Sequence, residues 1–170
     1  MAGDAGDPLI TIKQQLVAVL APLMPALSDA ALELVPVTYF WPGTDHKRAE
    51  HVWMNGGRSV VDIPTYKAGR KRRNYETTFE IIVEAQRVGV QLDESNATTL
   101  QLEVDQAVEA ITRVIDEYLA DNPLIGLDAE DLPRVVDKVQ LVNIDRAGGP
   151  FDTGAMSRNI LTVRYGARAL

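Results

Sequence analysis

The 170-residue chain contains no cysteine and only two histidines, His46 and His51. Without thiols it forms neither a disulfide framework nor a thiolate metal site, and two histidines are too few for a structural zinc site. No apolar run reaches the roughly 18 residues that a membrane-spanning helix requires. The segment 1–7 is small and acidic rather than basic and apolar, so we expect neither a signal peptide nor a membrane anchor.

Short motifs of the common enzyme classes are also missing. The sequence has no nucleophile elbow, no HExxH, no P-loop and no GxGxxG that opens a helix. The pairs Gly56-Gly57 and Gly148-Gly149 fit turns better than phosphate-binding loops. Asp45-His46 and Glu50-His51 place carboxylates beside imidazoles, but sequence neighbours seldom face each other, and we interpret both histidines as exposed loop residues. The sequence therefore predicts no catalytic residue, no cofactor and no metal.

Positive charge is gathered in one short segment. The chain carries a net charge of −7, and one run places five cations within seven residues, namely Lys67, Arg70, Lys71, Arg72 and Arg73. With these five removed the remainder carries −12, which argues against nucleic-acid binding by the whole surface. Only Tyr66 and Tyr75 flank the run, so it lacks the aromatic platform of single-strand binders. It is either a solvated loop or a contact with phosphate or an acidic protein surface.

The clearest structural pattern runs from Tyr75 to Asp121. Alternate residues of the first part are apolar, with Ile82 as the exception, which predicts a half-buried strand: Tyr75, Phe79, Ile81, Val83 and Ala85. After Gly89, a helix from about Ser95 to Asp121 carries an apolar stripe: Leu100, Val104, Ala107, Val108, Ile111, Ile115, Tyr118 and Leu119. Thr98 and Gln101 predict a capping box, with Ser95 or Asn96 as the cap one turn earlier. We expect the stripe to pack on the apolar strand face.

The residues before this pattern predict a helix and several strands. Asp7-Pro8 opens a helix that ends about Ala21 to Met24 and carries an apolar face: Leu9, Ile12, Leu16, Val19, Leu20 and Leu23. Ser28 to Glu33 adds a helical turn, and 34–41 is rich in strand-forming residues. We expect Asn55-Gly56 to turn a hairpin between Glu50–Met54 and Ser59–Ile63, so that 44–74 forms an extended hairpin or loop insertion.

The C-terminal third predicts a hairpin. Arg134–Arg146 is a strand whose apolar parity switches between Leu141 and Val142, which indicates a bulge. The sequence AGGPFDTGA, Ala147–Ala155, is a nine-residue connection, and Met156–Arg168 is the closing strand. The length of the whole chain, 170 residues, predicts a single domain over 1–170. Strands adjacent in sequence, with helices on one face, predict an α+β fold with a mainly antiparallel sheet.

This order of elements resembles the tail terminator, or tail completion, proteins of long-tailed bacteriophages. The resemblance rests on the N-terminal helix, the strand YETTFEIIVEA, the long helix, VDKVQLVNID and the closing NILTVRYGARAL. It covers Tyr75 to Arg168 well and Asp7 to Phe40 loosely. Segment 44–74 is longer than the resemblance leads us to expect.

The resemblance implies an architectural virion protein, assembled in the host cytoplasm. Such proteins form a ring, usually a hexamer, that ends the tail tube at its head-proximal side. The ring contacts the tube protein and the head-completion or stopper protein, and non-specific contact with DNA in transit is a further expectation. We expect subunit contacts at Gly148, Gly149 and Phe151, because Phe151 is apolar in a polar loop. Other neck or head–tail connectors, a cytosolic regulatory or nucleic-acid-binding domain, and an enzyme remain as alternatives.

Overall fold

The fold consists of two helices and eight strands in the residues that the structure, a computed structural model, describes: 6–27, 33–43, 49–62, 66–67, 70–71, 73–89, 91–128, 130, 132 and 134–168. The helices are α1 (Leu9–Leu20), extended by a 3-10 turn η1 (Ala21–Leu23), and α2 (Ala97–Asp121). The strands are β1 (Val37–Thr38), β2 (Glu50–Asp62), β3 (Tyr66–Lys67), β4 (Arg70–Lys71), β5 (Asn74–Val88), β6 (Val135–Val136), β7 (Gln140–Phe151) and β8 (Gly154–Arg168).

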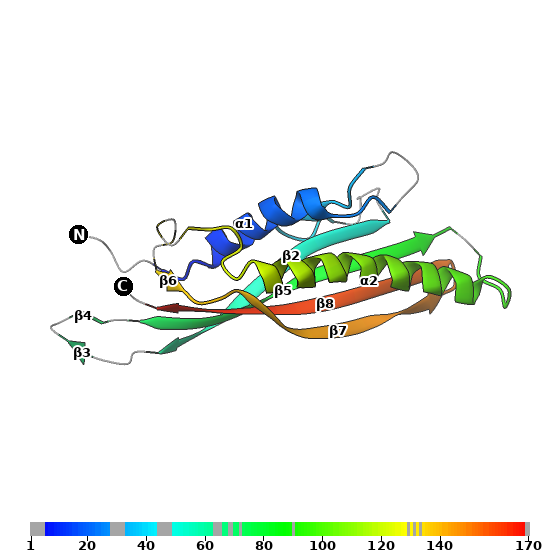
Figure 1. Cartoon of the computed structure of the whole chain (residues 1–170). Helices are drawn as coiled ribbons and strands as arrows, with labels where there is room; N and C mark the ends of the chain where they lie inside the picture. The colour runs from blue at the N-terminus through cyan, green and yellow to red at the C-terminus, as the bar shows by residue number, and fades with distance from the viewer. Residues whose placement is uncertain are drawn as a thin grey trace.

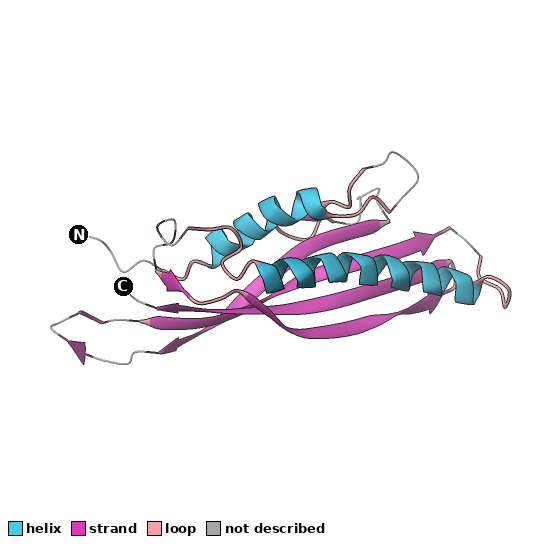
Figure 2. Cartoon of the chain, viewed as in Figure 1, coloured by secondary structure: helices cyan, strands magenta, loops and turns pink. Residues whose placement is uncertain are grey.

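Both helices lie on the same face of a curled sheet (Figures 1 and 2). The sheet order is β1-β2-β5-β8-β6, with β7 also paired to β8, and every pairing except the parallel β1–β2 is antiparallel. The β5–β8 ladder at its centre runs from the Tyr75–Ala167 pair to the Val88–Gly154 pair. The predicted α+β class, with a long helix on one sheet face and a C-terminal hairpin, is confirmed.

The apolar stripe of α2 packs on β5 and β8, as its spacing predicts. Its buried residues are Val104, Ala107, Val108, Ile111, Ile115 and Leu119, and they join the odd residues of β5 and β8 in one core cluster. Ile111 and Ile115 are fully buried there. A helix of 25 residues spans about 37 Å at 1.5 Å per residue, long enough to follow most of the sheet.

The start of α2 differs from the predicted capping box. Asn96 is the N-cap residue but makes no side-chain capping bond. Asp93 supplies the side-chain cap instead, because its Oδ1 accepts hydrogen bonds from the backbone amides of Ser95 at 2.8 Å and Asn96 at 3.1 Å. Gln101 turns toward β8 rather than back to the cap, so its amide is not available for a capping box.

Asp7 ties the start of α1 to the middle of the sheet. Its carboxylate accepts a hydrogen bond from the Leu9 amide at 3.1 Å, which satisfies an orphan donor as the predicted cap does. It also accepts from the hydroxyls of Ser59, Thr77 and Tyr165. Burial, and then the hydrogen bond to Asp7, raise the pKa of Tyr165. One carboxylate therefore joins α1, β2, β5 and β8.

The predicted hairpin around Asn55-Gly56 is wrong, because β2 continues through it as one strand. Met54 faces Ile81 and Gly57 faces Phe79, so the dipeptide adds one residue to the ladder and forms a bulge. A Cβ on Gly57 would lie 2.8 Å from the Leu9 Cδ2. The bulge thus brings a bare backbone under α1, and segment 50–62 belongs to the sheet rather than to an insertion.

The other sheet face carries a buried row that explains why Ile82 breaks the alternation. Ile82 lies between Trp53 and Ile160 across the strands, and Ile82 and Trp53 are buried. Glu84, which the alternation of β5 assigns to the polar face, is buried beside them and accepts a hydrogen bond from Arg158 Nε at 2.8 Å. That guanidinium carbon lies 5.8 Å from the Trp53 ring centroid, so an ion pair covers an apolar ring.

Two smaller expectations also need correction. The strand expected over 34–41 is only the two residues of β1, and Phe40 and Trp41 beyond it are exposed. Pro36 directly precedes β1 and Pro42 follows Trp41, and both prolines lack the amide that a longer ladder requires. Leu23 is exposed rather than part of the α1 face. The helical turn expected over 28–33 lies largely outside the described residues.

Replacing Ile111 with alanine should lower the free energy of unfolding by about 2 to 5 kcal/mol, because the loss of burial adds to a cavity. Urea unfolding followed by circular dichroism measures this. Leu102→Ala on the same helix is the matched control, since Leu102 is exposed, and it should cost far less. Equal costs for the two variants would show that the α2 face is wrongly assigned.

Replacing Asp7 with alanine should cost about 1 to 3 kcal/mol, because it leaves buried hydroxyl donors without their acceptor. Asp62→Ala, at an exposed position of β2, controls for the loss of one negative charge. Parallel urea titrations compare the two. An Asp7→Ala protein as stable as Asp62→Ala would remove Asp7 from the structural role given above.

Candidate functional site

The basic segment forms a narrow ribbon that projects beyond the helices at one end of the sheet (Figure 1). β3 and β4 pair antiparallel there, with Lys67 opposite Arg70 and Tyr66 opposite Lys71. Only the backbone of these residues is described, and Arg72 lies outside the described residues. Arg73, at the base of the ribbon, is exposed. The structure therefore places the backbone of Lys67, Arg70, Lys71 and Arg73 at one extremity of the molecule.

Arg134 fixes the base of this ribbon to the body. Its side chain is buried, its Nη1 donates to the Arg73 carbonyl at 2.5 Å, and its guanidinium lies 4.7 Å from the centroid of the Tyr75 ring. Both contacts suit a planar cation. Sequence reasoning missed this residue, since an arginine before a short strand carries no distinguishing pattern.

An open groove of about 730 Å³ lies next to the ribbon, between the ends of β2, β5 and β8 and the β6–β7 connection. Its charges are mixed and largely paired: Arg168 contacts Asp137 at 3.2 Å and Arg164 contacts Glu76 at 3.8 Å. All four side chains are exposed, so each pair is weak in water. This groove does not present charge of one sign to a ligand.

The predicted connection Ala147–Ala155 is wrong, because β7 continues to Phe151 and only Asp152 and Thr153 form the turn. Gly148 pairs with Ser157 and Gly149 with Met156. Gly148 has φ +149°, and a Cβ there would lie 2.4 Å from the Met156 carbonyl oxygen. Glycine is therefore needed for close approach of two strands rather than for a loop.

Phe151 lies at the outer end of β7 and is 39% exposed. Its cross-strand neighbour Gly154 separates it from Val88, which is 60% exposed. These two apolar side chains flank the turn end of the sheet, opposite the end that carries the ribbon. Phe151 is thus exposed as expected, although it belongs to a strand.

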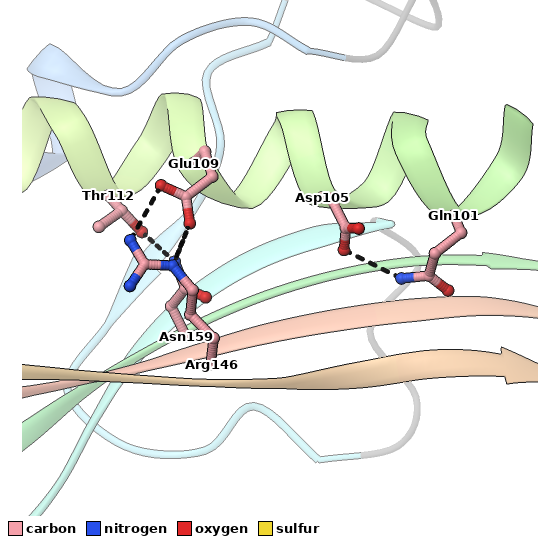
Figure 3. Close-up of polar contacts among 6 residues, drawn as sticks. All are labelled: Gln101, Asp105, Glu109, Thr112, Arg146 and Asn159. Atoms are coloured by element: carbon pink, nitrogen blue, oxygen red, sulfur yellow. Dashed lines mark hydrogen bonds and ion pairs between the residues drawn. The ribbon is translucent and has the colours of Figure 1, made fainter. Parts of the chain in front are cut away.

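A polar seam joins α2 to the β7–β8 hairpin (Figure 3). The Glu109 carboxylate accepts two bonds from Arg146, from Nε at 2.8 Å and from Nη2 at 3.3 Å. It also accepts from the Asn159 amide at 3.0 Å, and that amide donates to the Thr112 hydroxyl at 3.0 Å. Asn159 and Thr112 are buried, so the seam satisfies polar groups inside an apolar layer.

The seam continues into an open groove of about 510 Å³ beside the N-terminal half of α2, which we call the α2–β7 groove. Its lining includes Gln101, Asp105, Glu109, Arg146, Gly148 and Gly149. The Gln101 amide nitrogen donates to Asp105 Oδ1 at 2.9 Å and to the Met156 carbonyl at 3.3 Å. Its Oε1 is buried and has no hydrogen-bond partner within the described part of the chain.

Arg146 and Asn159 set the electrostatics of the seam. Hydrogen bonds from these two side chains hold the pKa of Glu109 below its ordinary range, and the Glu109 bond raises the pKa of Arg146. The predicted interface glycines Gly148 and Gly149 therefore line a groove next to an ionised pair. The remaining seam residues were missed, although Asn159 and Thr112 give a signal as polar residues on otherwise apolar faces.

The carboxylate–imidazole pairs do not form an acid–base site in the described residues. Glu50 and His51 are consecutive on β2, so their side chains project to opposite faces of the sheet. Glu50 is fully buried and pairs with Arg87 at 2.8 Å, while the His51 Nε2 lies 3.2 Å from the Thr38 hydroxyl. The interpretation of His51 as an exposed loop residue is wrong. Asp45 and His46 lie outside the described residues.

No family model matches this sequence, and no curated protein matches it. Within the described residues, no group of three or more potential ligands is placed to hold a metal ion. None of the helices described here combines the length and the apolar character needed to cross a membrane.

Replacing Glu109 with glutamine should make stability less dependent on acid. Because the folded pKa of Glu109 lies below its ordinary 4.5, its contribution is present above that value and is lost as the pH falls through the folded pKa. Glu109 is 46% exposed, so solvent screening keeps the effect below about 1 kcal/mol.

Urea midpoints between about pH 5 and pH 3, the range in which such a carboxylate titrates, measure this dependence. The parent should lose more stability than Glu109→Gln over that range. Glu103→Gln, at an exposed position of the same helix, should keep the slope of the parent. The same slope for the parent and Glu109→Gln would show that the seam adds no measurable stability.

Proposed function

We propose that this protein is a tail terminator of a long-tailed bacteriophage, which forms a ring on the head-proximal end of the tail tube. The observation that carries the proposal is the arrangement of elements: an N-terminal helix, a long alternating strand, a helix of seven turns on one sheet face and a C-terminal hairpin. This is the order on which the family resemblance rests. The role is architectural and assigns no catalytic residue.

The unprotected edges of the sheet support assembly with neighbours. In the described residues β7 pairs with β8 alone, and β1 covers β2 only at Val52 and Trp53. Both outer strands therefore present backbone donors and acceptors along most of their length. Such edges favour pairing with another chain unless they are blocked.

The exposed apolar residues at the turn end of the sheet support a second contact. Phe151 and Val88 lie in one cross-strand row there, and exposed aromatic residues are the usual anchors of protein interfaces. In a ring this row is repeated in every subunit. Subunit contact at Phe151, with Gly148 and Gly149 nearby on β7, is part of the proposal.

The ribbon supports a contact with an acidic partner. In a hexamer, five cations per subunit give about 30 positive charges around the ring. Tail tube protein, the head-completion or stopper protein and DNA in transit are the candidate partners. We favour protein, because tight phosphate binding would retard DNA that must pass.

Negative-stain images of the purified protein test the proposed ring. Sixfold rings that also end growing tubes, when added to polymerising tube protein, are the expected result. Rings that bind heads but do not stop tube growth would point to another neck connector. Compact monomers at all concentrations would contradict the architectural function.

Replacing Phe151 with aspartate should weaken ring formation while the subunit stays folded, because it places a charge in an apolar contact. Sedimentation velocity measures the ring fraction, and circular dichroism checks the fold. Ile10→Asp is the matched control, since Ile10 is an exposed apolar residue of α1 and lies on neither outer strand. Unchanged assembly of Phe151→Asp would exclude this residue as an anchor.

A further inference from the structure

The ribbon and the α2–β7 groove carry opposite charge and lie at opposite ends of the same strands. The ribbon contains Lys67, Arg70 and Lys71 at the Asn74 end of β5. The groove reaches Ser157, whose partner on β5 is Ala85. Ala85 lies eleven positions after Asn74 on β5, which corresponds to about 37 Å at 3.4 Å per residue.

This separation prevents one molecule from joining its own two sites. Exposed charges more than about 10 Å apart are largely screened at physiological salt. The ribbon cations therefore gain little from the groove of their own chain. A second molecule brings the two together without any change in the fold.

The groove side is acidic and already holds one arginine. Helix α2 contains six carboxylates, Glu103, Asp105, Glu109, Asp116, Glu117 and Asp121, and a single cation, Arg113. Glu109 binds the Arg146 guanidinium through two nitrogens. The groove thus has carboxylate acceptors of the kind that bind a guanidinium.

Asp105 and Gln101 are the acceptors that the seam does not use. Asp105 is exposed and accepts a bond from Gln101, and the Gln101 Oε1 has no partner within the described residues. Both side chains extend from α2 toward the strands (Figure 3). A cation held here would satisfy a buried carbonyl oxygen and pair with a carboxylate.

We propose that the α2–β7 groove of one molecule receives the basic β3–β4 ribbon of a second copy, with Asp105 and Gln101 as acceptors for its Arg or Lys side chains. The inference rests on the proposed function for its ring geometry, because repeated head-to-tail contacts form a ring when the rotation between copies closes. It assigns the ribbon to a second copy in place of the tube or stopper protein named above. It also gives Gly148 and Gly149 a role, since these residues form the β7 wall of the groove.

Charge reversal tests this contact. Asp105→Lys should lower the association constant at least about tenfold, because a like charge replaces an opposite one. Glu117→Lys is the matched control: it makes the same charge change at an exposed position of α2 outside the groove, and it should assemble nearly as the parent does. Sedimentation velocity and negative-stain images give the readout.

A complementary variant on the ribbon completes the experiment. Arg70→Glu combined with Lys71→Glu should also lose assembly by itself. Mixed with Asp105→Lys protein it should regain assembly, because each interface in an alternating ring then joins opposite charges. Urea unfolding of each variant confirms that the subunits are folded, and the recovery on mixing excludes misfolding independently.

The outcomes separate the contact from the ring. Parent rings that persist in Asp105→Lys, or the absence of recovery on mixing, would overturn the contact and leave the ring. A parent dimer that Asp105→Lys dissociates would support the contact and overturn the ring, whereas a monomeric parent overturns both. Ribbon variants that assemble normally but no longer retain duplex DNA on a shift gel would replace the second copy with nucleic acid.

Discussion

The packing of α2 on the central β5–β8 ladder is the interaction on which the rest of the fold depends. It fixes which sheet face is buried, because the odd residues of β5 and β8 meet the α2 stripe in one core cluster. Asp7 then seats α1 on the same face by bonding to β2, β5 and β8. With both helices on one side, α2 lies beside β7 and forms the α2–β7 groove with it. Within the described residues, β7 pairs only with β8, and β1 covers only two residues of β2, so these outer strands and the groove are the surfaces on which the proposed assembly relies.

The periodic parts of the fold were predictable from sequence because burial there has a simple repeat. Alternation located β5 and β8, the three-and-four spacing located α2, and the parity switch at Val142 correctly indicated the bulge between Leu141 and Asn143. Each pattern arises from a face that must be apolar over many residues. In such segments the local spacing of apolar residues is enough to locate the helix or strand.

Glycine-rich segments were misjudged because glycine permits both turns and close strand contacts. Asn55-Gly56 has the composition of a two-residue hairpin turn, yet β5 offers a continuous ladder and the dipeptide becomes a bulge. Gly148 looks like a loop residue, but its lack of a side chain lets Met156 approach. The candidate groove was missed for a different reason. Asp105 and Arg146 are far apart in the sequence, and only the tertiary fold brings their segments together.

The positions of the opposite charges also limit how copies can associate. Two molecules side by side in parallel place ribbon beside ribbon and α2 beside α2, so like charges face each other at both ends. Only arrangements that bring the end of one copy to the opposite end of another join the acidic and basic sites. One exposed ion pair contributes at most about 1 kcal/mol, but a closed ring holds every subunit through two such contacts, so the loss of one does not release it. In the proposed ring, the edge strands and the Phe151 row would add non-ionic contacts to an orientation that charge has selected.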